Sequence, residues 1–178
     1  MWLVVLAAAG LVGSGCARTT IEHPLDTNYP GADTGAELEF WHALPARPVV
    51  SNDEGLHGLI LLALGQDSAG AYDARVALAK QEGWLAPDFD EPADLAMQRG
   101  TLARAITVIL DIKGGLMMHL LGPTARYSTR ELVYLQLLSE PSTENLVISG
   151  LEYVGVISKA QDYRALHAPR PGPEAPNG

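Results

Sequence analysis

Few residues in the chain have the types and spacing that catalysis or metal binding requires. A serine nucleophile of the Gly-x-Ser-x-Gly kind needs glycine two residues before the serine, but Gln66 holds that place before Ser68. We therefore predict that Ser68 caps a helix. The histidines are dispersed, and Asp53 and His57 are four residues apart, a spacing that places two ligands on one helix face. Two ligands do not hold a metal ion, so we predict no metal site and no cofactor.

An acidic loop and a glycine pair are the other candidate ligand sites. An EF-hand calcium loop that started at Asp88 would need glycine at its sixth position and glutamate at its twelfth. Those positions hold Ala93 and Arg99, so the loop is interpreted as a solvated acidic segment, with a less regular calcium loop as the alternative. Gly114 and Gly115 could cradle an anion at a helix start, but the rest of a phosphate-loop pattern is missing. We interpret them as a helix end and a turn.

The single cysteine, Cys16, follows a short apolar run and three small residues. The run, residues 2–12, is too short to cross a hydrocarbon core of ~30 Å as a helix. It fits the apolar region of an export signal. A small-residue run that ends in cysteine resembles the bacterial lipoprotein signal, in which the cysteine is acylated and becomes the first residue of the mature chain.

This resemblance implies a signal peptide at residues 1–15, lipid on Cys16, and an exported protein anchored to a membrane of the cell envelope, in the periplasm or at the cell surface. Gly13 stands where these signals favour leucine, and no basic residue precedes the apolar run. The alternatives are a plain secretion signal with an incidental cysteine, and a buried first helix of a cytosolic chain.

Charge and composition narrow the class of protein. The chain of 178 residues carries 12 Lys and Arg against 21 Asp and Glu, for a net charge of −9. Nucleic-acid binding needs clustered basic residues that replace phosphate counterions, and no such cluster is present, so we expect no nucleic-acid partner. A hydrophobic content of 47% is enough for one domain with a buried core.

The pattern of caps, glycines and prolines predicts an all-α fold. Residues 16–33 resemble a flexible tether, residues 34–165 a small multi-helix domain, and residues 166–178 a disordered tail rich in proline. Helices are predicted from the capping residues and apolar stripes over about 34–44, 52–64, 68–82, 99–112, 116–121, 129–138 and 150–164. Ser51 or Asn52 is the predicted cap of the second of these helices and Gly65 its end, and Ser149 is the predicted cap of the last. The segment 99–112 is apolar nearly all round, so we expect it to be the central buried helix.

Three of the predicted helix starts are alike, namely those at residues 97–103, 128–133 and 148–154. Each has a polar capping residue, then Arg99, Arg130 or Gly150, and an aliphatic or aromatic residue further on. Before the first start lies a helix, a glycine turn, and an extended piece with Phe89 and a proline. This order resembles the S-layer homology repeat, a small helical module that occurs in tandem and anchors proteins to cell-wall polymers. The match is degenerate outside residues 72–112.

The resemblance implies that Arg99 and Arg130 lie in a groove that binds cell-wall glycan. The alternative interpretation is that they form surface ion pairs with carboxylates of the acidic loop. Because no catalytic pattern is recognisable, we expect a non-catalytic envelope lipoprotein that acts as a structural or protein-interaction module. Its partners would be the membrane, through lipid on Cys16, and an envelope protein. A glycan-binding module and an enzyme with an unrecognised site are the alternatives.

Overall fold

The computed structural model describes residues 18–29 and 33–168, and the regular elements in these residues are all helical. The helices are α1 (Thr34–Ala43), η1 (Leu44–Ala46, a 3-10 helix), α2 (Asn52–Leu64), α3 (Tyr72–Gln81), α4 (Arg99–Ile109), α5 (Leu116–Leu121), α6 (Ala125–Tyr134) and α7 (Gly150–His167). Extended segments in this part of the chain pair only as isolated bridges. The prediction of an all-α fold is confirmed. None of the described helices has both the length and the hydrophobicity of a membrane span.

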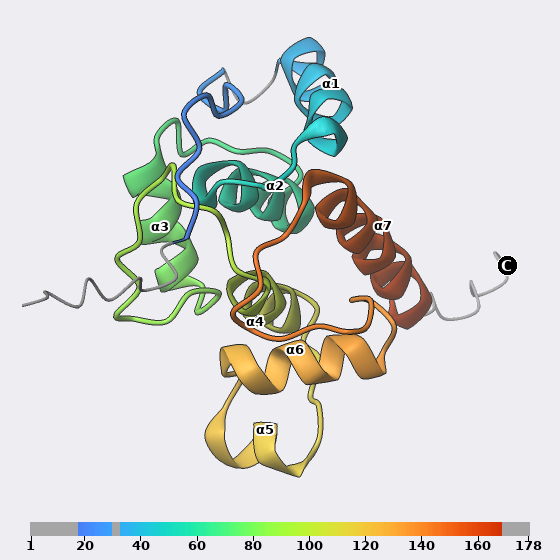
Figure 1. Ribbon diagram of the computed structural model, residues 1–178. Helices are drawn as coiled ribbons and strands as arrows, with labels where there is room; N and C mark the ends of the chain where they lie inside the picture. Colours follow the sequence, from blue (N-terminus) through green and yellow to red (C-terminus); the bar gives the residue numbers. More distant parts are fainter. Residues whose placement is uncertain (1–17, 30–32, 169–178) are drawn as a thin grey trace, which may run out of the picture.

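The core surrounds α2, which is buried along most of its length (Figure 1). The Ser51 side chain accepts a hydrogen bond from the Glu54 amide, and the Glu54 carboxylate accepts one from the Ser51 amide. This capping box satisfies two amides that a helix start otherwise leaves unpaired. The helix ends at Gly65, in the left-handed conformation with φ 77°, as its position in the sequence predicts.

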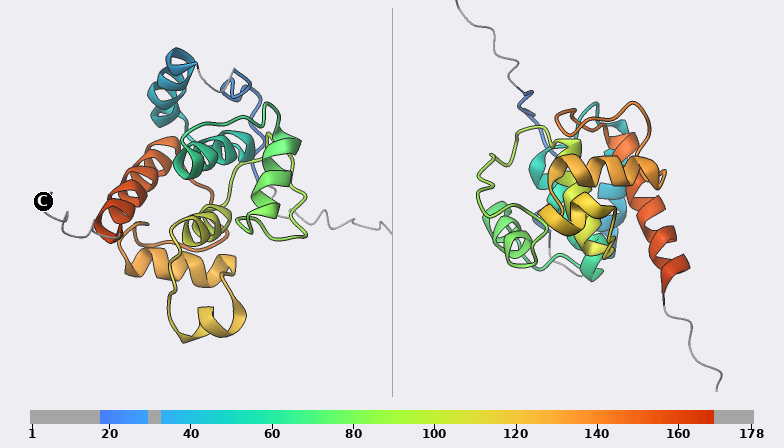
Figure 2. Two further views of the ribbon diagram at one scale, coloured as in Figure 1. Left: turned by 180° about the vertical axis from the view of Figure 1, so that it is seen from behind. Right: turned by 90° about the horizontal axis from the view of Figure 1, so that it is seen from below.

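Helices α4 and α7 complete the core, and α6 packs against α4 (Figures 1 and 2). α4, which the sequence predicted as the central helix, contributes the fully buried Leu102 and Ile106, but the core surrounds α2 instead. Tyr153 of α7 is also fully buried, and its hydroxyl donates to the Gly55 carbonyl of α2 at 2.7 Å. A side chain on Gly58 would collide with Tyr153, so this close contact between α2 and α7 requires glycine.

The starts of α2, α4 and α7 meet in a closed ring of backbone hydrogen bonds. Val50, Met97 and Ile148 each lie one residue before the N-cap of one of these helices, and all three are fully buried. The Val50 amide donates to the Ile148 carbonyl (3.0 Å), the Ile148 amide to the Met97 carbonyl (3.2 Å), and the Met97 amide to the Val50 carbonyl (2.8 Å). Three segments that are distant in sequence therefore fix one another's positions. We call this arrangement the three-helix ring.

Two predicted helix starts are wrong, and one of them belongs to the predicted repeat. Ser128 does not cap a helix, because α6 begins at Ala125, where the Thr124 side chain accepts from the Tyr127 amide. Ser128 lies inside α6 and is fully buried. Two of the three similar helix starts, those of α4 and α7, belong to the three-helix ring. Its third member is the start of α2, and the segment around Ser128 is not part of the ring. Ser68 also caps no helix, since α3 begins only at Tyr72.

Residues 18–29, which we call the N-terminal strap, lie against the domain. Thr20 and Leu95 form an antiparallel bridge, and the amide of the buried Ile21 donates to the Asp94 carbonyl at 2.8 Å. The strap is therefore part of the folded unit, although the sequence suggested a tether over 16–33 and a domain that begins at residue 34. Cys16 and the predicted signal peptide lie outside the described residues.

The C-terminal helix is longer than the sequence suggested. α7 continues through His167, two residues beyond the predicted domain end at 165. The rings of Tyr163 and His167 stack one turn apart, with centroids separated by 3.9 Å. Most of the predicted tail, residues 169–178, lies outside the described residues.

Candidate functional site

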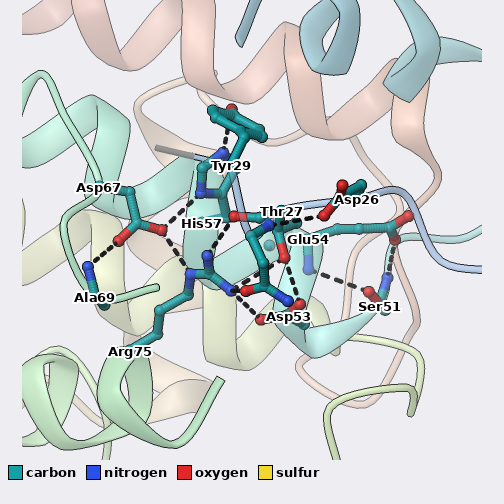
Figure 3. Close-up of polar contacts among 12 residues, drawn as sticks. Asp26, Thr27, Tyr29, Ser51, Asp53, Glu54, His57, Asp67, Ala69 and Arg75 are labelled. Carbon is teal, nitrogen blue, oxygen red and sulfur yellow. Dashed lines mark hydrogen bonds and ion pairs between the residues drawn. The ribbon is translucent and has the colours of Figure 1, made fainter. Parts of the chain in front are cut away.

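A buried polar cluster joins the N-terminal strap to α2 and α3 (Figure 3). The cluster consists of Thr27, Tyr29, Asp53, His57, Asp67 and Arg75. The strap supplies the first two, α2 the next two, the loop after α2 the fifth, and α3 the last. Asp53 and His57 lie one turn apart on α2, on a shared face as their spacing predicts. Four separate segments therefore contribute to one network.

Arg75 lies at the centre of the cluster, and its side chain is 1% exposed. Its Nε donates to Asp67 Oδ2 at 2.5 Å, and its Nη1 donates to Asp53 Oδ1 at 2.7 Å. Nη1 also donates to Thr27 Oγ1 at 3.0 Å, and Nη2 to the Thr27 carbonyl at 2.5 Å. A buried guanidinium is tolerated only when its donors are satisfied and its charge is opposed. Two carboxylates and the strap meet both conditions.

Asp67 links Arg75 to His57. Its Oδ2 accepts from His57 Nδ1 at 2.6 Å, and its Oδ1 accepts from the Ala69 amide at 2.9 Å. Burial acts to raise the pKa of Asp67, but the hydrogen bonds from His57, Arg75 and Ala69 outweigh it and lower the pKa to about 2. Asp67 is therefore ionised at neutral pH and accepts only, so the proton of the His57–Asp67 bond is carried by Nδ1.

Tyr29 completes a chain of carboxylate, imidazole and hydroxyl. The Tyr29 hydroxyl lies 2.5 Å from His57 Nε2, within hydrogen-bonding distance. Acyl-transfer triads use the same order of groups to activate a hydroxyl. Burial and the nearby carboxylates of Glu37 and Asp67 raise the pKa of Tyr29 to about 12, so the phenol keeps its proton at neutral pH. This hydroxyl is a hydrogen-bond donor and a poor nucleophile.

Aromatic rings shield the imidazole from solvent. Tyr29 and Phe40 meet His57 edge to face, with ring centroids 5.1 and 4.8 Å away, and His57 is 1% exposed. The same two aromatic residues line a groove of about 320 Å³ beside α1. A substrate in this groove would contact the aromatic rings, and the imidazole behind them would stay covered. The imidazole therefore links Asp67 to Tyr29 behind these two rings.

The strap is also held outside the cluster, among other points at Leu25 and at Arg18. Glu54 is fully buried, and its Oε1 accepts from the Leu25 amide at 2.8 Å while Arg47 Nε lies 3.4 Å from the same oxygen. Arg18 forms an ion pair with Glu91 of the loop between α3 and α4. Contacts with the domain therefore span the strap from Arg18 to Tyr29.

The predicted glycan-binding arginines lie on either side of one loop. Arg99 donates to Ser142 Oγ at 3.0 Å and to the Pro141 carbonyl at 3.3 Å, and it pairs with Glu152 of α7 at 2.6 Å. Its partner is thus on α7, and the alternative pairing with the acidic loop is wrong. Arg130 is exposed and lines an open groove of about 490 Å³ with Tyr134 and residues 140–142. The loop is shared, but Arg99 is not among the residues that line this groove.

The sequence indicated neither the strap residues of the cluster, Thr27 and Tyr29, nor Asp67 and Arg75. Asp67 lies in a loop, and its partners are ten residues before it and eight after it, so no helical spacing relates them. A usable signal was Arg75 itself, which interrupts the apolar face of the α3 segment and is buried among carboxylates in the structure. A charged residue at a core position requires a buried counter-ion.

Residues 18–29 and 33–168 contain no group of three or more His, Cys, Asp or Glu side chains placed to hold a metal ion, and this includes the acidic loop after α3. Comparison of the chain with protein-family models, with curated proteins and with solved structures gave no match. The inferences that follow therefore depend on the residues and their geometry.

Proposed function

We propose that the protein is a non-catalytic lipoprotein of the cell envelope, exported and held at a membrane by lipid on Cys16, whose helical domain is a structural or protein-interaction module. The observation that carries the proposal is the attachment of the N-terminal strap to the core. Hydrogen bonds and ion pairs from Glu54, His57, Arg75 and Glu91 hold residues 18–29, a segment that begins two residues after Cys16.

The attachment has a mechanical consequence for an anchored protein. Cys16 lies two residues before Arg18, whose ion pair with Glu91 belongs to the folded domain. Two residues of extended chain reach only ~7 Å. A lipid on Cys16 would therefore hold the domain against the membrane surface, and pulling on the anchor would act on the strap and the cluster. This favours a role in which a domain is kept at a fixed place, where it meets envelope partners.

Acyl labelling tests the anchor. The full chain is expressed in a bacterium with a clickable fatty acid, with and without globomycin, beside Cys16→Ser. We expect label on the wild type that remains with the membrane fraction, loss of label in Cys16→Ser, and an unprocessed, larger precursor under globomycin. Equal labelling of the wild type and Cys16→Ser, or no label on either, would refute the lipid anchor.

A second candidate function is a module similar to the S-layer homology repeat that binds cell-wall glycan. Two observations favour it: the three-helix ring relates two of the predicted repeat starts, and Arg99 and Arg130 flank the 140–142 loop. Arg130 is the exposed cation of the pair, beside the exposed ring of Tyr134. The groove that they line also contains Glu140, and charged and aromatic side chains placed together suit a sugar.

Sedimentation with purified cell-wall sacculi distinguishes this candidate from the first. The matched variants are Arg130→Ala in the groove and Arg126→Ala, an exposed arginine of the same helix that does not line it. Glycan binding predicts that the wild type and Arg126→Ala sediment with sacculi and Arg130→Ala does not. Equal sedimentation of all three would remove Arg130 from the mechanism.

A further inference from the structure

Helix α5 projects from the domain below α6 (Figure 1). Most of its apolar side chains are exposed to solvent. Leu116, Met117, Leu120 and Leu121, which we call the α5 tip, are 82%, 43%, 75% and 54% exposed. Met118 is the residue of α5 that is buried, and it packs over Gly114 at the base of the projection. The short helix is thus fixed at one point while four large apolar side chains face outward.

Exposure on this scale in one place points to a binding surface. Single exposed leucines are common and need no explanation, but a contiguous apolar group marks a site that contacts a protein or a membrane. The α5 tip does not complete the described core, because its four side chains lie on the solvent side of a helix whose contacts are with α6. Its partner must therefore cover leucine and methionine side chains.

The charge around the α5 tip differs from the rest of the chain. Residues 111–131 contain three basic side chains, Lys113, Arg126 and Arg130, against two acidic ones, Asp111 and Glu131. Removing this segment from the 12 basic and 21 acidic residues of the chain leaves 9 basic against 19 acidic. Lys113 and Arg126 are exposed at either end of the projection, with Asp111 paired to Lys113. Apolar residues flanked by cations complement a bilayer that has anionic headgroups.

We propose that the α5 tip inserts into the headgroup region of a bilayer that contains anionic lipid, with Lys113 and Arg126 at the phosphates. The inference rests on the proposed membrane address, but it does not depend on acylation of Cys16. In the intact protein the tip would give the domain a second contact with the membrane and so fix its orientation. An apolar groove of a partner protein would fit the leucines but would not account for the local excess of positive charge.

Depth-dependent fluorescence tests the inference. Cys16→Ser in the full chain leaves no cysteine, so a single new cysteine can carry an environment-sensitive dye at Leu120→Cys or at the control position Leu166→Cys. Leu166 is 81% exposed on α7, outside the tip. With vesicles of phosphatidylglycerol and phosphatidylcholine, we expect a blue shift and quenching by brominated lipid at position 120 and neither change at position 166.

Three results would overturn the proposal. A dye at 120 that stays in water while the protein sediments with vesicles would show that the chain binds by another part, such as residues 1–15. A blue shift at 120 that requires no vesicles and grows with protein concentration would identify a self-association surface.

The double variant Leu116→Gln/Leu120→Gln changes two exposed positions of the tip. It should bind anionic vesicles about tenfold more weakly than the wild type, and unchanged binding would also count against the tip. Acyl labelling of Cys16 is a separate measurement, so failure of the anchor and failure of the tip remain distinguishable.

Discussion

The Arg75 side chain lies between Asp53 and Asp67 and is 1% exposed. Its Nη2 group donates a hydrogen bond to the Thr27 carbonyl. We expect Arg75→Met to lower the free energy of unfolding by about 3–5 kcal/mol, because removing one partner leaves buried carboxylates unopposed. Urea unfolding followed by circular dichroism measures the change. The control is Lys113→Ala, whose ion pair with Asp111 is exposed and contributes ~0–1 kcal/mol. A loss of less than 1 kcal/mol for Arg75→Met would contradict the role assigned to the cluster.

Asp67 gives the cluster a defined pH dependence. Its pKa is about 2 in the folded protein against an ordinary value of 3.8, so the folded state holds this carboxyl ionised more strongly than the unfolded state does. The stability that results is fully present above pH 3.8 and is lost as the pH falls from 3.8 towards 2. The wild type should therefore be more stable than Asp67→Asn at pH 6, and the difference should shrink across this window. A difference in urea midpoint that is constant from pH 6 to pH 2 would contradict the prediction.

At the residue scale, the sequence predicted less than half of the cluster. The spacing of Asp53 and His57 indicated a shared helix face, which the structure confirms. Their partners could not be predicted, because Asp67 and the strap reach them through loops whose path depends on tertiary contacts. Local capping preference pointed to Ser68 as a helix start, but the chain uses this loop to place Asp67 beside His57 and Arg75.

At the scale of elements, the start of α7 is set by Gly150. A Cβ atom there would lie 1.7 Å from the Leu44 carbonyl oxygen of η1, and the Gly150 amide donates to the Arg47 carbonyl at 2.9 Å. The helix start packs directly against the backbone of η1. This explains why the third repeat-like segment has glycine where the first two have arginine: no side chain fits.

Two glycines of α7 provide a matched pair of substitutions. Gly150→Ala should destabilise the domain and disturb the three-helix ring, because the clash is with backbone atoms that cannot move aside cheaply. Gly155→Ala meets no atom within 4 Å and should stabilise the protein by about 0.5–1 kcal/mol through higher helix propensity. Thermal unfolding of both variants measures the effects. Equal changes of the same sign would refute the proposed packing of α7 on η1.

Most helices could be predicted because their ends carry local signals. The Ser51 and Ser149 caps and the glycine at 65 are recognisable from the sequence and are confirmed. The start of α6 was missed because Ser128, a good capping residue by type, is used inside the helix, where it is fully buried. The three-helix ring could not be predicted either, since its hydrogen bonds join backbone groups about 50 to 100 residues apart in sequence and no pattern of side chains indicates them.

At the scale of the whole molecule, the strap decides how an anchored domain would move relative to the membrane. If residues 18–29 are held by the buried cluster, an anchor at Cys16 and the domain move as one body, and the α5 tip can contact the bilayer in a defined orientation. If the strap is free, it acts as a flexible tether, the domain moves independently of the anchor, and the cluster has no part in anchoring. The composition suggested a tether, because Thr, Asn and Pro are frequent and no periodicity is present; the strap is instead fixed by single long-range contacts.

Hydrogen exchange of the strap, followed by mass spectrometry, tests this claim most directly. The amides of Ile21 and Leu25 donate to the Asp94 carbonyl and the Glu54 carboxylate, so peptides from the strap should be protected in the wild type. In Arg75→Met, strap peptides should lose protection to a greater extent than peptides from α4. Exchange of the wild-type strap at the rate of an unstructured peptide would contradict the account.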